Sequence, residues 1–207
     1  MLLEFLKSNF DPGKPIFASD AAPLGLTAVN LRQQFKKLVD AHRLVRCDPG
    51  VYYLPDETGE YSDKPSANMV AERKYIRDGL EIFGYYSGYT FANRVGICLQ
   101  VPYKEEIVTN RATAAVRQVE IGNVPFLVRR PKTMVTSENR DVLQLLDLLK
   151  DVEEYTDHEC EAEAPELIRE HVRRNGITRA QVDQFIGLFP LKTYKNIYDL
   201  RLTDAFA

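Results

Sequence analysis

The first 42 residues carry short apolar clusters between turn-forming residues, a pattern that predicts three helices. Leucine and phenylalanine positions within residues 2–6 fit one face of a first short helix. Ser19 or Asp20 can cap a second short helix over residues 21–24, because short polar side chains satisfy free amides at a helix start. A third, longer helix is expected over residues 27–42, with Thr27 as its cap.

Two β-rich runs follow this third helix and predict a hairpin. The runs LVRC and VYYL are separated by Asp48, Pro49 and Gly50, and a Pro-Gly pair favours the two central positions of a β-turn. Three helices followed by a hairpin in about 55 residues is the order of a winged helix-turn-helix. In that architecture the last helix enters the DNA major groove and the hairpin lies beside the backbone.

The third helix has one apolar and one polar side. At 100° per residue, Leu31, Phe35 and Leu38 fall within about 60° and predict the buried stripe. The opposite side carries amide and basic side chains and no acidic residue before Asp40. Amides can pair with adenine edges, and Arg or Lys with guanine or phosphate. The candidate DNA-binding residues, including two arginines that flank the start of the hairpin, are Thr27, Asn30, Arg32, Gln33, Lys36, Lys37, Arg43 and Arg46.

The remaining chain predicts a second, mixed domain. Residues 56–65 are polar and turn-rich and are expected to link a first domain, 1–56, to a second, 66–207. Within the second domain we expect helices, strands around a turn at residues 122–123, and a long helix that begins at Ser137 or Asn139 and runs to residue 155. Its expected buried face is Val142, Leu145, Leu146 and Leu149. An acidic connector, expected to be exposed, and further helices then close the chain, with Thr178 as the expected cap of the second of these helices. The predicted fold class is α+β: a winged helix-turn-helix followed by a mixed α/β domain with a small sheet and C-terminal helices.

Charge is distributed unevenly along the 207 residues. The net charge is -3, but residues 1–55 carry seven Lys or Arg against five Asp or Glu, whereas residues 136–207 carry nine against fifteen. Any contact with nucleic acid is therefore expected in the front half. The three cysteines are far apart and odd in number, which favours reduced thiols in a cytoplasmic protein. No apolar run approaches the length of a membrane span, and residues 1–10 do not resemble a signal peptide.

Catalytic and metal-binding patterns are not evident, so we expect no enzyme activity, catalytic residue, metal site or cofactor. The residues His158, Cys160 and His171 fit no standard zinc spacing. Glu105 and Glu106 begin a predicted strand and are expected on the surface. The sequence has neither a phosphate-binding glycine loop nor a nucleophile elbow, and the tyrosines of the YYSGYT run are expected to pack in the core.

Three stretches together carry a resemblance to a known family. They are CDPGVYYLP at the hairpin, GYYSGYTFANRVGICLQVPYKEEIVTN with its S-G-x-T, Q-V-P and T-N elements, and RQVEIGNVPFLVRRP after it. Over about residues 1–150 the chain resembles the AbiEi-type antitoxins, the antitoxin and transcriptional-regulator half of type IV toxin–antitoxin systems.

The resemblance implies two activities. The winged helix would repress its own operon by binding inverted repeats in promoter double-stranded DNA, with a recognition helix over 27–42 and a wing over 44–54. The second domain, marked by residues 87–110, would neutralise a nucleotidyltransferase-like toxin, usually without a stable complex. A net charge of +2 over residues 1–55 predicts modest affinity per monomer, and therefore dimeric or cooperative binding, with a homodimer on DNA as one arrangement.

Two other functions compete with this interpretation. The polar side of the third helix can be an ordinary solvated face, and the winged helix a protein-interaction module that binds no DNA and docks a partner through the acidic residues 151–207. An enzyme acting on nucleotides or nucleic acid is the third possibility. Selective, salt-sensitive DNA binding would separate the first function from the second.

Overall fold

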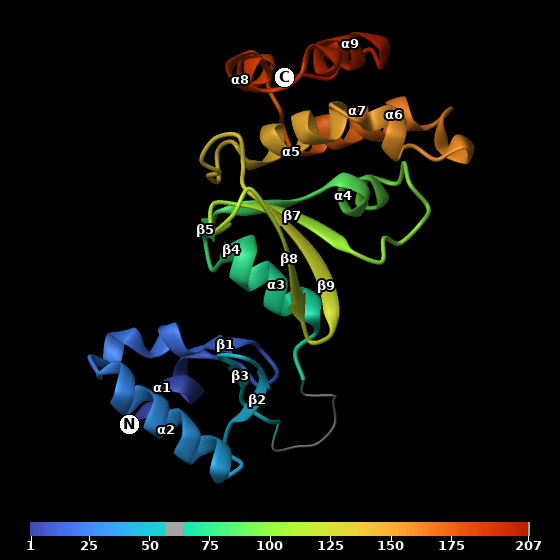
Figure 1. The fold of residues 1–207 in the computed structure, drawn as a ribbon. Helices are drawn as coiled ribbons and strands as arrows, with labels where there is room; N and C mark the ends of the chain where they lie inside the picture. The colour runs from blue at the N-terminus through green and yellow to red at the C-terminus, as the bar shows by residue number, and fades with distance from the viewer. Residues whose placement is uncertain (57–63, 207) are drawn as a thin grey trace. The chain divides into compact units, whose positions relative to one another are not determined.

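The computed structural model describes residues 1–56 and 64–206, which form a mixed α+β chain as the sequence predicts (Figure 1). Contacts divide the chain into two compact units. The first comprises Met1–Arg73 and Ile121–Val124, and the second comprises Lys74–Glu120 and Pro125–Ala207. The domain limits expected from the sequence, 1–56 and 66–207, stay a prediction. Within the described part of the chain, no helix is both long enough and apolar enough to cross a membrane.

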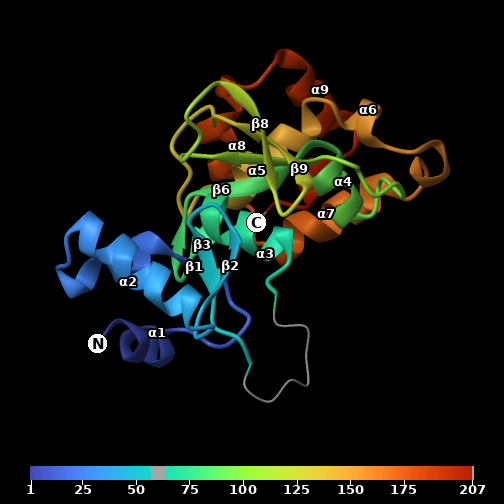
Figure 2. The same cartoon turned by 60° about the horizontal axis from the view of Figure 1, so that its bottom comes forward.

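The first unit combines helices with a three-stranded sheet. Its elements are α1 (Leu2–Asn9), β1 (Ile16–Phe17), the 3-10 helix η1 (Ala18–Leu24), α2 (Ala28–Asp40), β2 (Val45–Asp48) and β3 (Val51–Tyr53). The strand order is β1-β3-β2, with both neighbouring pairs antiparallel. Figure 2 shows α1 and α2 to one side of this sheet. The predicted hairpin is therefore confirmed.

An apolar core joins the helices of this unit to its sheet. Leu6 from α1, Phe35 from α2 and Leu44 before the hairpin are almost fully buried, and the Phe35 ring lies 4.7 Å from that of Tyr52 on β3. The predicted stripe of α2 is confirmed in position: Phe35 is buried, and Leu31 and Leu38 pack partly buried against the same cluster. Burying such side chains contributes about 2 kcal/mol each.

The helix expected over residues 21–24 differs from the prediction in its type and in its first residue. It is a 3-10 helix that begins at Ala18, and its cap position is Phe17 rather than Ser19 or Asp20. Asp20 instead lies inside the first turn, where its Oδ2 accepts a hydrogen bond from the Phe17 backbone amide at 2.7 Å. Pro23 lacks the amide that a regular helix would use, so a short and tight helix is the physical outcome.

The second unit is built on a four-stranded sheet. Helix α3 (Ala67–Tyr75) crosses the division between the units. The remaining elements are β4 (Arg77–Asp78), β5 (Glu81–Ile82), β6 (Gly84–Ser87), α4 (Gly88–Val95), β7 (Glu105–Thr109), β8 (Val116–Ile121), β9 (Val124–Arg129), α5 (Arg140–Leu149), α6 (Val152–Tyr155), η2 (His158–Cys160), α7 (Ala164–Arg174), α8 (Arg179–Phe185), η3 (Ile186–Leu188), α9 (Leu191–Asp199) and η4 (Leu202–Asp204). The strand order is β6-β7-β9-β8; β6 pairs antiparallel with β7, and β7 pairs parallel with β9.

Close backbone packing explains a glycine at the start of β6. A Cβ on Gly84 would meet the backbone carbonyl oxygen of Tyr75, and it would lie 2.7 Å from that of Val108. Backbone atoms cannot move aside as a flexible side chain can, so this position accepts only glycine without rearrangement.

Helix α5 is covered on both sides, which the sequence does not predict. All residues from Val142 to Leu149 are buried, including Gln144 and Asp147, and not only the expected face. Helices α4 and α5 pack against the sheet, and α8 and α9 pack on α5 from the other side (Figure 1). The Nε2 of Gln144 donates to the Tyr86 carbonyl at 2.7 Å, which satisfies this buried amide.

Two further expectations about this unit are wrong in part. The long helix expected over residues 139–155 ends at Leu149, because Asp151 leaves helical backbone with φ -135°, and a separate turn, α6, follows. The acidic connector is partly folded into η2, where Cys160 is 7% exposed. Caps expected at Thr27 and Thr178 are confirmed by hydrogen bonds from the amides of Asn30 and Gln181.

Candidate nucleic-acid interface

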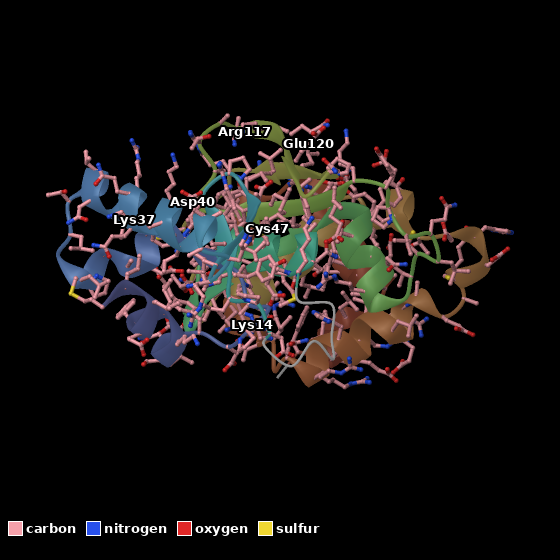
Figure 3. All side chains as sticks on the ribbon, turned by 90° about the horizontal axis from the view of Figure 1, so that it is seen from below. Lys14, Lys37, Asp40, Cys47, Arg117 and Glu120 are labelled. Atoms are coloured by element: carbon pink, nitrogen blue, oxygen red, sulfur yellow. The ribbon has the colours of Figure 1, made fainter. Side chains whose placement is uncertain are left out.

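Helix α2 presents its polar residues to solvent. Asn30, Arg32, Gln33, Lys36 and Lys37 are all exposed, as is Thr27 at the cap. Figure 3 shows Lys37 and Asp40 on this helix. The apolar residue Val29 on the same side is 65% exposed. The exposure of these residues agrees with the prediction that they share one outward side of the helix. Their role in DNA binding stays a prediction.

The basic side chains of this face make no ion pair within the described part of the chain. No carboxylate lies within ion-pair distance of Arg32, Lys36 or Lys37 among the described residues. On α7 the opposite holds, since Glu166 pairs with both Arg169 and Arg173. Unpaired cations on an exposed helix keep their full charge for an external anion such as phosphate.

Amide side chains on α2 are partly engaged with each other. The Oδ1 of Asn30 accepts a hydrogen bond from the Nε2 of Gln34 at 3.0 Å. Bidentate pairing of Asn30 with adenine would require this exposed bond to open. Gln33 makes no hydrogen bond within the described residues, so its amide is the more available of the two predicted base-reading groups.

The two arginines predicted at the hairpin differ in their surroundings. Arg46 on β2 is exposed, and its Nε donates to the Asp48 carbonyl at 3.4 Å next to a register shift in the β2–β3 pair. Arg43 is exposed and lines a hollow of 410 Å³ together with Phe10 and Leu54. At the hairpin tip Gly50 has φ +75°, which glycine adopts without strain.

A buried charge cluster in the second unit was not predicted. Asp147 on α5 is buried and accepts hydrogen bonds from the Ser87 hydroxyl, from Arg129 at 3.1 Å and from Lys150 at 2.6 Å. Arg129 also lies 3.6 Å from the carboxylate of Glu106. Glu106 is therefore half-buried beside a cation, and the expectation that it lies on the surface is wrong.

Glycine at position 88 makes room for this cluster. Gly88 begins α4 with φ +54°, and a Cβ there would overlap the Glu106 carboxylate. Two other residues of the S-G-x-T run also contact the cluster: the Ser87 hydroxyl donates to Asp147, and the Thr90 hydroxyl accepts from the backbone amide of Glu106 at 2.8 Å. The only sequence signal for the cluster was this run itself.

The cluster is balanced in charge. Burial alone raises the pKa of Asp147, but attraction to Arg129 and Lys150 outweighs it and holds the pKa below its ordinary value. Two carboxylates and two cations compensate each other, with Ser87 only 2% exposed. The arrangement ties β6, β7, β9 and α5 together.

Histidine and cysteine side chains of the second unit lie in different environments. The His158 side chain is 93% exposed and meets Glu161, whereas Cys160 is buried. His171 packs its ring 5.1 Å from that of Phe91. Burial first, and then the positive charges of Arg174 and Arg140, lower the pKa of His171 to about 4. His171 is therefore a neutral packing residue at neutral pH.

The chain was compared with protein families, curated proteins and solved structures. No family model matches the chain, and neither the curated proteins nor the solved structures include a significant match.

Proposed function

We propose that the first unit is a winged helix-turn-helix that binds promoter DNA, and that the protein is a cytoplasmic antitoxin that represses its own operon. The element order α1-β1-η1-α2-β2-β3 and the strand order β1-β3-β2 support this proposal. They supply three helical segments and a hairpin, of which α2 would be the recognition helix and the β2–β3 hairpin would be the wing.

The observation that carries the proposal is the outward side of α2. Two amides lie on it together with three cations that have no ion-pair partner in residues 1–56 and 64–206, and no acidic residue of the helix occurs before Asp40. Lys36 and Lys37 would contact phosphates, while Gln33, Asn30 and Arg32 would read base edges. Arg46 on the wing and Arg43 beside it would add backbone contacts.

A charge-reversal experiment tests this assignment. In the full-length protein, Lys36→Glu with Lys37→Glu should abolish selective binding to the upstream DNA, and it should lower the slope of log K against log salt by about 0.9 per lost phosphate contact. The matched control is Lys14→Glu with Lys132→Glu, which changes the net charge equally at two exposed lysines outside α2. The control should bind as the unmodified protein does.

Loss of binding in both variants would mean that net charge, and not this helix, governs association. Unchanged binding in the α2 variant would refute the helix assignment. Far-UV circular dichroism of each variant checks that the fold is retained.

The antitoxin half of the proposal rests on the resemblance of the chain, over about residues 1–150, to AbiEi-type antitoxins. The partner would be a nucleotidyltransferase-like toxin, neutralised without a stable complex. Growth rescue on co-expression with the toxin from the neighbouring gene tests this. The α2 charge-reversal variant should still rescue growth, because neutralisation would depend on the second unit. Failure of the unmodified protein to rescue would refute the antitoxin role and leave DNA binding to be judged separately.

A further inference from the structure

Helix α9 has one buried and one exposed side. Thr193, Asn196 and Ile197 face the second unit, and the Asn196 amide donates to the Leu149 carbonyl at 2.7 Å. On the opposite side Leu191 is 84% exposed and Tyr198 is 79% exposed. Figure 1 shows α9 at the outer edge of the helices that cover the sheet of its unit.

The exposed side forms a continuous apolar stripe. Leu191, Tyr194 and Tyr198 are three and four residues apart, so at 100° per residue they fall within about 60° of helix circumference. Tyr194 is 47% exposed, and Leu188 just before the helix is 43% exposed. Aligned apolar and aromatic side chains of this kind are typical of a protein–protein contact.

Charged residues lie beside the stripe, with the positive side chains preceding the negative one along the helix. Lys195 pairs with Asp199 at 3.2 Å and with Glu153 at 3.5 Å, and Lys192 pairs with Asp151. The helix therefore carries a cation in its first turn, at Lys192, a second at its centre, at Lys195, and a carboxylate in its last turn, at Asp199. A second copy of the same helix is complementary to this order only when it runs antiparallel. A parallel copy would set lysine against lysine.

We propose that two copies of this chain associate through α9 in an antiparallel pair. With the two-fold axis near position 196, Tyr194 packs against the partner's Tyr198. Lys195 then falls opposite position 197, which is about 3 Å along the helix axis from the partner's Asp199 at 1.5 Å per residue. The antiparallel helix dipoles add to the attraction. This contact lies in the second unit and does not depend on the proposed DNA binding.

The size of the stripe sets the expected strength. Nine residues of helix span only about 14 Å, and stable interfaces bury about 800 Å² per partner. An interface centred on one short helix is at the weak end, so we expect a monomer–dimer equilibrium in the micromolar range.

Sedimentation equilibrium of the full-length protein without DNA, from about 5 to 200 µM, tests the proposal. The average mass should rise from 23.7 kDa toward twice that value. Tyr198→Glu should weaken association at least tenfold. The matched control is Met134→Glu, which places the same charge at an apolar residue that is 72% exposed outside α9, and it should leave association unchanged.

A charge swap tests the antiparallel orientation. Lys195→Asp alone should weaken association, and adding Asp199→Lys should restore it, because the swapped helix is again complementary to itself when antiparallel. A constant mass of 23.7 kDa across the range would overturn the proposal. Equal weakening by Tyr198→Glu and Met134→Glu would also overturn it. Since no DNA is present, neither outcome bears on the winged-helix assignment.

Discussion

The packing of His171 predicts that the second unit loses stability as the solution is acidified. Its ring contacts Phe91, and burial together with Arg174 and Arg140 lowers its pKa to about 4, against an ordinary value of 6.5. Between these two pH values, His171 is therefore protonated in the unfolded chain but neutral in the folded chain. The contribution of His171 to folding stability is fully present above pH 6.5 and is lost as the pH falls toward 4.

The magnitude follows from the two pKa values. Between pH 7.5 and pH 5.0, the difference in proton binding at His171 costs about 2 kcal/mol of folding free energy. Urea unfolding at both pH values measures this loss, and His171→Gln removes the titrating group. The unmodified protein should lose about 2 kcal/mol more than the variant does between pH 7.5 and 5.0.

Proton NMR gives an independent readout of the same group. The imidazole signal that disappears in His171→Gln should not titrate above pH 5 in the folded protein. A midpoint near 6.5 for that signal, or equal pH dependence of unfolding in both proteins, would show that the fold does not lower the pKa of His171.

Four further variants, one of them a control, are compared with the unmodified protein by urea unfolding. Asp147→Asn should destabilise the protein by about 3 kcal/mol, because two partly buried cations lose their carboxylate. The same change at Asp183, whose ion pair with a neighbouring arginine is exposed, should cost under about 1 kcal/mol. Gly84→Ala should cost about 3 kcal/mol, since its Cβ meets two backbone carbonyl oxygens; a neutral result would contradict the packing at β6. Thr27→Ala should cost about 1 kcal/mol through the lost cap of α2, and no change would contradict that cap.

Features with a local physical cause were predictable from the sequence. The Pro49–Gly50 turn and the caps at Thr27 and Thr178 depend on residues within three positions of each other, and the structure has each of them. The α2 stripe follows from the helical period in the same way. The winged-helix and DNA-binding interpretations remain predictions, because they concern a partner and not local geometry.

Features that depend on long-range packing were not predictable. Ser87, Glu106, Arg129 and Asp147 come from four separate elements, and no spacing along the chain connects them. The burial of Asp147 requires helices on both sides of α5, which the amphipathic pattern of α5 alone does not specify. The exposed stripe of α9 was not predictable either. Helical periodicity shows which apolar residues share one side of a helix, but it does not show which of them pack within the chain.

Binding of the purified protein to its own upstream DNA, compared with random DNA at two salt concentrations, tests the proposed repressor function. We expect tight and sequence-selective binding that weakens as salt rises, because phosphate contacts from the cations of α2 release counterions. Equal affinity for both DNAs, or no binding at low salt, would contradict it and would favour a protein-interaction role for the first unit.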